Sequence, residues 1–300
     1  MRLDLPPVSA APAGRGPAWL GWRERLPGLA ADVCADWQLT PDGEPTLGAA
    51  GLLLPVRSPA GAALLKLGWP HPEAAQEHLA LRAWGGRGAV TLLRADPHRA
   101  ALLLERVDPR ADLSSLPVDQ ACEVIAGLYR RLHRPPVPQL ERLSERARHW
   151  SEELRSLRGT SLAPRRFLDQ AAGLAADFGA ERGSDTALLH GDLHFGTVLL
   201  AGREPGWLSV DAEPLAGDPA YEPAPVLWHR WDEAVATQDL RGAVLDRFYL
   251  VVDGAGLDED RARAWVVVRA MVGVLLASRA PSPDPAAVTV ATTIVKAVQR

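Results

Sequence analysis

The chain has 300 residues, a formal net charge of −4 and a hydrophobic fraction of 47%, enough to bury the core of one large or two modest domains. The mild negative charge and the lack of a basic cluster argue against a nucleic-acid partner, and no apolar run is long enough to span a membrane. Two distant cysteines and the lack of a secretory signal pattern exclude a disulfide framework and indicate a protein of the reducing cytoplasm.

The first third of the chain is predicted to be rich in strands. After a loose arm over residues 1–16, apolar residues recur at helical spacing and then give way to short apolar runs separated by small residues. The predicted elements are a helix over 19–37 broken at Pro27, strands over 46–56 and 63–67, a helix over 72–84, and strands over 90–93 and 101–104. A stretch rich in Pro, Asp and Ser follows, and we place a domain boundary after residue 108.

Two features of this strand-rich part are suited to binding a phosphate. Gly48 and Gly51 flank a small-residue turn that would let backbone N–H groups approach a ligand, but an ordinary hairpin looks the same, so both interpretations stay open. Lys66 ends an apolar strand, where a charge is costly unless it is paired. It is one of two lysines in a chain that otherwise uses Arg, which indicates a point charge on a flexible stem. The alternative is a side chain that snorkels from an edge strand.

Residues 109–300 are predicted to be helical apart from one hairpin. The predicted helices cover 118–134, 140–157, 164–178, 220–235, 240–252, 258–277 and 285–298, and short strands are predicted over 187–189, 198–200 and 207–210. A small strand-rich part followed by a larger helical part is an α+β arrangement.

The loop after residue 189 concentrates ionisable groups. It reads His-Gly-Asp-Leu-His-Phe-Gly-Thr over 190–197, and rigid scaffolds commonly present catalytic groups on such loops. Asp192 precedes a strand–turn–strand and Asp211 follows it, so we expect both carboxylates at the same end of a hairpin. The spacing from His190 through Asp192 to Thr197 matches the kinase catalytic loop H-R-D-x-x-x-x-N, with Thr in the Asn place. Asp211 stands where the metal-binding Asp of a kinase would stand.

The His-Gly-Asp-Leu-His run over 190–194 and the segment Asp-Ala-Glu-Pro-Leu-Ala-Gly-Asp-Pro-Ala-Tyr over 211–221 together resemble the aminoglycoside phosphotransferase superfamily. The resemblance is closest to its streptomycin and hydroxyurea kinases and extends from about Trp19 to near the C-terminus. It implies a protein-kinase-like two-lobed fold, with a nucleotide-binding lobe over 1–108 and a helical lobe over 109–300. It also implies phosphorylation, by ATP with Mg²⁺, of a hydroxyl group on a small molecule, either an aminoglycoside-type antibiotic or hydroxyurea.

The resemblance also implies roles for individual residues. Asp192 would be the general base that accepts the proton of the substrate hydroxyl, and His190 would orient its loop. Asp211 would hold Mg²⁺, with Thr197 as a second and weaker ligand. The implied nucleotide-binding positions are Lys66 paired with Glu77, the hinge from Glu105 to Val107, and the glycines Gly48 and Gly51.

Several positions depart from the family pattern. Thr197 replaces an Asn expected to hold a metal, and the chain contains no Asn that could take its place. Restoring Asn at this position is therefore expected to raise turnover. Glu213 stands where Lys is usual, Glu222 where Asp is usual, and His229 where Asn is common. These departures favour one alternative, a nucleotide-binding pseudokinase.

A second alternative is a metal-dependent hydrolase. His190, Asp192 and His194 form a clustered ligand motif, although such a site needs further ligands and the other histidines are scattered. Acidic residues recur in the helical part and would suit a polycationic substrate. A solvated helical face, with Asp258 as an N-cap, accounts for most of them.

Overall fold

The computed structural model describes residues 17–48, 51–69, 75–108, 110–204, 206–279 and 285–299. The contacts divide the chain into two units. Unit 1 is Met1–Pro109 with Leu200–Glu213, and unit 2 is Arg110–Leu199 with Pro214–Arg300. The sequence does not indicate that residues 200–213 return to unit 1, since the division after residue 108 keeps them with the helical part.

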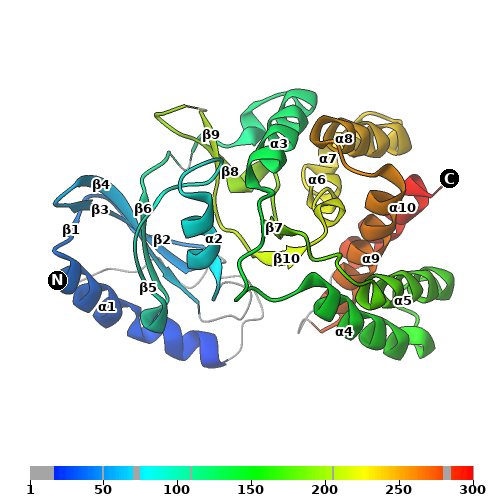
Figure 1. Ribbon diagram of the computed structural model, residues 1–300, viewed down its shortest axis with the longest axis horizontal. Helices are drawn as coiled ribbons and strands as arrows, with labels where there is room; N and C mark the ends of the chain where they lie inside the picture. Colours follow the sequence, from blue (N-terminus) through cyan, green and yellow to red (C-terminus); the bar gives the residue numbers. More distant parts are fainter. Residues whose placement is uncertain are drawn as a thin grey trace. The chain divides into compact units, whose positions relative to one another are not determined.

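Unit 1 is built on one antiparallel sheet. Its strands are β1 (Thr40–Pro41), β2 (Thr46–Leu47), β3 (Gly51–Ser58), β4 (Gly61–Gly68), β5 (Leu92–Asp96) and β6 (Ala101–Glu105). Their order is β1-β3-β4-β6-β5, and β2 pairs with β3 (Figure 1). The predicted turn at Ser58–Gly61 closes the β3–β4 hairpin and sets a register that pairs Leu53 with Lys66. The strand predicted over 90–93 begins later, at Leu92, because Ala89 and Val90 pair with Ser209 instead.

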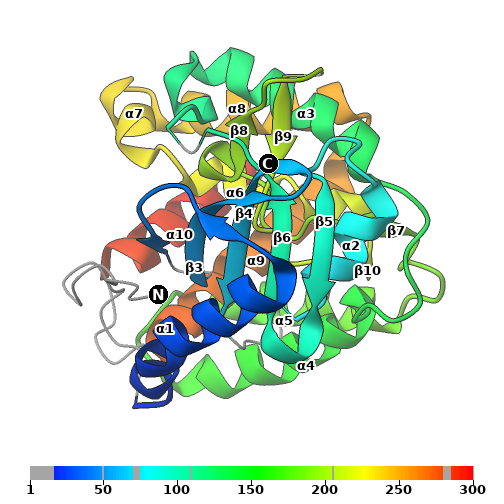
Figure 2. The same cartoon turned by 90° about the vertical axis from the view of Figure 1, so that its left-hand side faces the viewer.

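Helix α1 (Pro17–Trp37) covers one face of this sheet, and Figure 2 shows it on the near side of the strands. Trp22 and Leu26 belong to the same buried core as Leu54 and Leu65. The break predicted at Pro27 is wrong, because the helix continues through this residue. A proline inside a helix costs about 3 kcal/mol, and burial of a large apolar helix face outweighs that cost.

Helix α2 (Glu77–Trp84) follows β4 in the chain. It ends as predicted at Gly85, which has a left-handed φ of 56° and whose N–H bonds to the carbonyl of Leu81. The predicted first turn, over residues 72–74, lies outside the described residues.

Unit 2 contains most of the helices. They are α3 (Val118–Leu132), α4 (Leu143–Ser156), α5 (Arg165–Ala180), α6 (Ala224–Trp228), α7 (Trp231–Ala236), α8 (Leu240–Ala255), α9 (Glu259–Ser278) and α10 (Pro285–Val298). Helix α9 is buried along most of its length, and its Trp265 and Met271 share one core with Phe167, Phe248 and Ile294. In the described part of the chain, no helix combines the length and the apolar character needed to cross a bilayer.

Short strands lie before and after the loop over residues 190–197. The predicted strand β7 (Ala187–Leu189) pairs with β10 (Leu215–Gly217). The sequence does not predict β10, because its three small or apolar residues carry no periodicity. Strand β8 (Val198–Leu200) and strand β9 (Trp207–Ser209) are joined by a turn in which the N–H of Ala201 bonds to the carbonyl of Gly206 at 2.6 Å.

The helix predicted over 220–235 is divided into two. Helix α6 ends at Trp228 and α7 begins at Trp231, with His229 and Arg230 forming a bend between them. Arg230 has a φ of 54°, in the left-handed region that non-glycine residues rarely occupy. The prediction of a continuous helix is therefore wrong, because tertiary contacts described below override the helical pattern.

Candidate active site

Lys66 lies at the centre of a buried charge cluster in unit 1. Its neighbours Leu65 and Leu67 are fully buried in the core beneath α1, so the alternation of a strand places Lys66 on the opposite face. There its Nζ lies 2.7 Å from Oε2 of Glu77, the first residue of α2, and 2.7 Å from Oδ1 of Asp211. The Lys66 and Glu77 side chains are each 3% exposed, whereas that of Asp211 is 40% exposed.

Two carboxylates keep this lysine charged. Burial alone would lower the pKa of Lys66, but the charges of Glu77 and Asp211, with their hydrogen bonds, outweigh burial and raise the pKa. The second oxygen of Glu77, Oε1, is buried and has no hydrogen-bond partner among the described residues. The cluster thus holds two carboxylates around one ammonium, and the carboxylate of Asp211 faces solvent in part.

Asp211 has an unusual backbone. It follows β9 with a φ of 56°, and non-glycine residues in this region are concentrated at functional sites. Ser209 of β9 accepts from the N–H of Val90 at 3.1 Å and donates to the carbonyl of Gly88 at 2.9 Å, which ties this segment to unit 1. A partly exposed carboxylate oxygen is the kind of ligand that Mg²⁺ prefers, so Asp211 fits the metal expected from the sequence.

Both carboxylate oxygens of Glu105 accept hydrogen bonds. Oε2 accepts from the N–H of Thr91 at 3.0 Å and from its hydroxyl at 2.9 Å. Arg203, in the turn after β8, donates hydrogen bonds to both oxygens, from Nε to Oε1 at 2.6 Å and from Nη2 to Oε2 at 2.8 Å. Burial would raise the pKa of Glu105, but these hydrogen bonds lower it. Its side chain is thereby occupied, and only the backbone from Glu105 to Val107 is left for the hinge role expected from the sequence.

Of the two glycines of the predicted phosphate loop, Gly51 has a packing explanation. Gly51 has a φ of 150°, and a Cβ at this position would lie 2.3 Å from the carbonyl oxygen of Leu67 in β4. The N–H of Gly48 donates to the carbonyl of Gly51 at 2.9 Å. Strand pairing therefore requires glycine at residue 51 whether or not a phosphate binds.

In unit 2, the start of the 190–197 loop is held by charges on both sides. The N–H groups of His190 and Gly191 donate to the carboxylate of Glu222 at 2.5 and 3.2 Å, and Glu222 and His190 are fully buried. Nη2 of Arg269 donates to the carbonyl of Gly191 at 2.9 Å. Gly191 has a φ of 87°, which explains glycine in this position. Both sides of Gly191 are thus fixed immediately before Asp192.

Glu222 is ionised despite its burial. Desolvation would raise its pKa, but His133, the charge of His190 and the N–H of His190 together lower it. Nε2 of His133 lies 3.7 Å from Oε1, too far for a strong hydrogen bond, so its effect is mainly electrostatic. The hydroxyl of Tyr129 donates to the backbone carbonyl of Glu222 at 2.9 Å, which fixes the residue itself.

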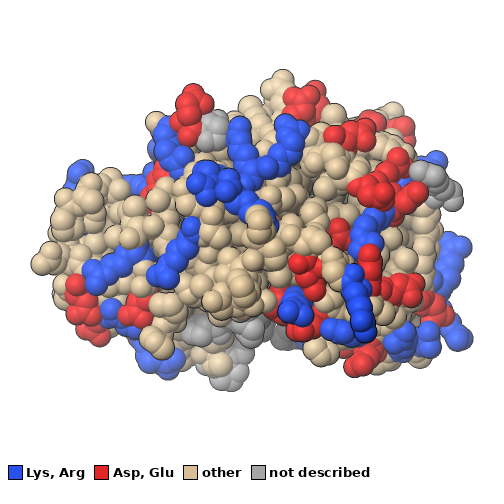
Figure 3. Space-filling model, viewed as in Figure 1, with Lys and Arg blue, Asp and Glu red and all other residues tan. Residues whose placement is uncertain are grey.

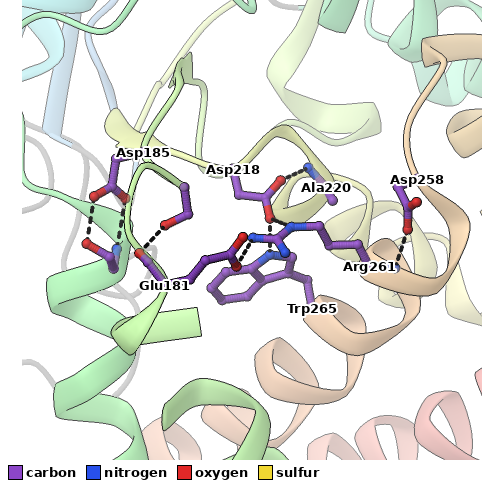
Figure 4. Close-up of polar contacts among 9 residues, drawn as sticks. Glu181, Asp185, Asp218, Ala220, Asp258, Arg261 and Trp265 are labelled. Atoms are coloured by element: carbon purple, nitrogen blue, oxygen red, sulfur yellow. Dashed lines mark hydrogen bonds and ion pairs between the residues drawn. The ribbon is translucent and has the colours of Figure 1, made fainter. Parts of the chain in front are cut away.

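The turn that carries Glu222 is anchored to α9 (Figure 4). Asp218 accepts from the N–H of Ala220 at 3.0 Å and from Nε1 of Trp265 at 2.7 Å, and it forms an ion pair with Arg261. Arg261 also binds Glu181 at 2.7 Å. This cluster explains the Asp-Pro-Ala-Tyr segment as a structural support for Glu222.

The hydroxyl of Thr197 braces its own loop. Oγ1 accepts from the N–H of His194 at 2.9 Å and lies 3.1 Å from the carbonyl oxygen of Asp192 and 3.2 Å from that of His194, to which it donates. Thr197 is 8% exposed. The metal-ligand role expected for Thr197 therefore competes with the use of its hydroxyl inside the loop.

Sequence reasoning misses two residues of this site. Arg203 carries no local signal, whereas Arg269 stands alone in the apolar run Trp265–Leu276, where an unpaired charge would be costly. No group of three His, Cys, Asp or Glu side chains positioned to hold a metal occurs within the described ranges.

The chain is similar to a family model and to known proteins. A family model described as "Aminoglycoside/hydroxyurea antibiotic resistance kinase" matches residues 36–280. Streptomycin 6-kinase of Streptomyces glaucescens is 39% identical over 298 residues, covering 96% of each chain. Hydroxyurea phosphotransferase of Kitasatospora aureofaciens is 40% identical over 259 residues, covering 84% of this chain and 73% of the relative.

A solved structure has the same fold. It is a thermostable mutant of the aminoglycoside phosphotransferase APH(4)-Ia in a ternary complex with ADP and hygromycin B. It is 13% identical, with a TM-score of 0.59 over 89% of this chain and 97% of the other. The fold class expected from the sequence, α+β and protein-kinase-like, is confirmed.

Proposed function

Because the chain belongs to the aminoglycoside/hydroxyurea antibiotic resistance kinase family, we propose that it transfers the γ-phosphate of ATP to a hydroxyl group of a streptomycin-like aminoglycoside or of hydroxyurea. The chain is a small-molecule phosphotransferase, and its kinase relatives do not favour the pseudokinase alternative. ATP, Mg²⁺ and the identity of the acceptor are parts of the proposal.

Unit 1 supplies the proposed nucleotide site. Lys66 would neutralise the ATP phosphates, with Glu77 holding its ammonium in place. The backbone from Glu105 to Val107 would bind adenine, and Gly48 and Gly51 would lie over the phosphates.

Asp211 is the proposed magnesium ligand. When bound, Mg²⁺ neutralises charge that develops on the phosphates. Asp211 offers a partly exposed carboxylate, while Thr197 would act mainly as the brace of its loop.

Unit 2 supplies the proposed base. Asp192 accepts the proton of the acceptor hydroxyl as that oxygen bonds to the γ-phosphorus and the bond to the ADP oxygen breaks. The Asp192 side chain is 34% exposed and so accessible to a substrate. His190, Glu222 and Arg269 support its loop through backbone contacts.

The observation that carries the proposal is the buried Lys66 between two carboxylates. Burying a charged lysine is costly, and an interior built for stability alone would use apolar residues. A lysine kept charged beside a partly exposed carboxylate is suited to a polyanion and its metal ion.

The acidic residues of unit 2 do not add evidence about the acceptor. Asp239 and Asp258 cap helices, as predicted for Asp258, while Glu233 and Glu259 pair with arginines. On the face shown in Figure 3, acidic side chains are interspersed with arginines over the helices. The proposed acceptor class therefore rests on the relatives.

Transfer of radiolabelled phosphate from ATP tests the proposal. The wild-type chain is incubated with streptomycin, hydroxyurea and hygromycin B, and labelled product is measured. We expect transfer to at least one of the first two and its loss in Asp192→Asn, with ATP affinity unchanged within a few fold. Full activity of Asp192→Asn would exclude the assigned base, and transfer to neither streptomycin nor hydroxyurea would exclude the acceptor class.

A further inference from the structure

The bend between α6 and α7, formed by His229 and Arg230, packs against the loop that carries Asp192. His229 is stacked face to face on His194, with ring centroids 3.5 Å apart and planes 6° apart. The guanidinium of Arg230 lies over Phe195, 5.2 Å from the ring centroid. Two consecutive residues of the bend thus cover two consecutive residues of the loop.

The bend is itself held firmly. Arg247 of α8 is 3% exposed and donates from Nη1 to the carbonyl of His229 at 2.8 Å and from Nη2 to that of Arg230 at 3.0 Å. Nη1 of Arg230 donates to the carbonyl of Leu116 at 2.9 Å. A buried guanidinium that uses both branches on adjacent carbonyls explains how the left-handed backbone of Arg230 is maintained.

His194 connects the bend to Asp192. Its Nδ1 accepts from the N–H of Gly196 at 3.1 Å, which places the proton of a neutral imidazole on Nε2. Nε2 lies 3.8 Å from Oδ2 of Asp192. At this distance the N–H attracts the carboxylate electrostatically without forming a short hydrogen bond. Because the Asp192 side chain is 34% exposed, the direction in which the His194 ring points influences the orientation of the carboxylate.

The His229 ring is suited to be an uncharged platform. Burial, with a smaller contribution from the nearby His194, lowers the pKa of His229 to about 4, although Asp192 acts in the opposite direction. At neutral pH the ring is therefore uncharged, and no repulsion between like charges disturbs the stack. One edge of His194 is fixed by Gly196 and one face by His229.

We propose that His229 is a positioning residue for phosphoryl transfer, because its ring keeps the Nε2–H of His194 directed at the carboxylate of Asp192. The inference rests on the role proposed above for Asp192 as the base. His229 touches neither substrate in this account, and acts only through His194. The bulk of an aromatic ring, and not the ring nitrogens, is the property that matters.

A double-mutant cycle tests this role. The variants are His229→Ala, His194→Ala and the double variant, with His149→Ala, an exposed histidine of α4, as the control. We expect His229→Ala to lower kcat about tenfold with the KM for ATP within about twofold of wild type, because a displaced base costs rate and not nucleotide binding. The double variant should be no slower than His194→Ala, since the two residues act in one chain of contacts.

His229→Phe separates positioning from stability. This variant keeps a flat ring and should retain at least about a third of the wild-type kcat. Thermal unfolding of every variant is measured in parallel. A His229→Phe variant with the wild-type Tm but a kcat about tenfold below wild type would overturn the platform role even if the alanine variant unfolds.

Two further results would also overturn it. One is an unchanged kcat in His229→Ala, and the other is an additive double variant in which each change costs its full factor. If the wild type transfers phosphate and either result is obtained with the variants, the positioning role fails while the proposed function stands. A wild-type chain that transfers phosphate to no acceptor overturns the proposed function, and the positioning role with it.

Discussion

Replacing Glu222 with Gln should destabilise unit 2 strongly at neutral pH. The substitution keeps the volume of the side chain but turns one of its two acceptor oxygens into an NH₂ group, which faces the N–H of His190 or of Gly191. A hydrogen bond to a charged group contributes about 1.5–3 kcal/mol, and an unsatisfied buried donor costs a similar amount. Because these two terms overlap, we expect a loss of about 3 kcal/mol in the free energy of unfolding.

Thermal unfolding at pH 7 measures this loss. For a unit of this size, 1 kcal/mol corresponds to about 2–4 °C in Tm, so the variant should unfold roughly 6–12 °C lower. Glu152→Gln on the exposed face of α4 is the matched control and should leave Tm within about 1 °C. A Tm for Glu222→Gln as high as that of the control would refute the structural role assigned to this carboxylate.

The difference should also depend on pH in one direction. The pKa of Glu222 is lowered in the folded state from its ordinary value of 4.5, so its charge stabilises the fold above that ordinary value. This stabilisation is lost as the pH falls through the folded pKa. Wild type and Glu222→Gln should therefore differ fully at pH 7 and converge below pH 4.5. A difference that stays constant into acid would contradict an ionised Glu222.

Three other substitutions test unit 1 and the loop brace. Lys66→Ala should lower kcat/KM by about 100-fold or more, the scale of one lost charge-stabilising donor, whereas the exposed Lys296→Ala should leave steady-state kinetics unchanged. Thr197→Asn should lower turnover, because the longer side chain disturbs the backbone contacts that the Thr197 hydroxyl makes. Turnover is measured over a range of magnesium concentrations, and a higher turnover than wild type would restore the ligand role expected from the sequence. Gly51→Ala should lower Tm through its clash with β4, whereas Gly28→Ala, with open space inside α1, should raise stability by about 1 kcal/mol in chemical denaturation.

The sequence predicts those features that depend on neighbours in the chain. Helices with clear periodicity, the turn at Ser58–Gly61 and the helix end at Gly85 are all found in the structure. The position of Lys66 at the end of an apolar run singles it out, since a charge in an apolar strand demands a partner. The partner Glu77 is confirmed as a contact of Lys66 at 2.7 Å.

Features that depend on distant residues are predicted less well. Asp211 is predicted as a metal ligand, but its bond to Lys66 joins residues 145 positions apart and has no local signature. The bend at His229 is fixed by Arg247, and the helix through Pro27 is fixed by packing on the sheet, so local pattern gives the wrong answer at both. Arg203 reaches Glu105 across 98 positions, which no periodicity could indicate.

The return of Leu200–Glu213 to unit 1 affects how the chain folds during synthesis. Lys66 leaves the ribosome long before Asp211, one of its two carboxylate partners. Bacterial or eukaryotic translation at roughly 5–20 residues per second adds the intervening residues over roughly 7–30 s. During that interval Lys66 has Glu77 but not Asp211 as a counter-charge. The backbone groups of Gly88 and Val90 also lack the hydrogen bonds that they later form with Ser209. The N-terminal portion alone should therefore be a poor independent product, whereas joining residues 200–213 to it through a short linker should supply the missing contacts.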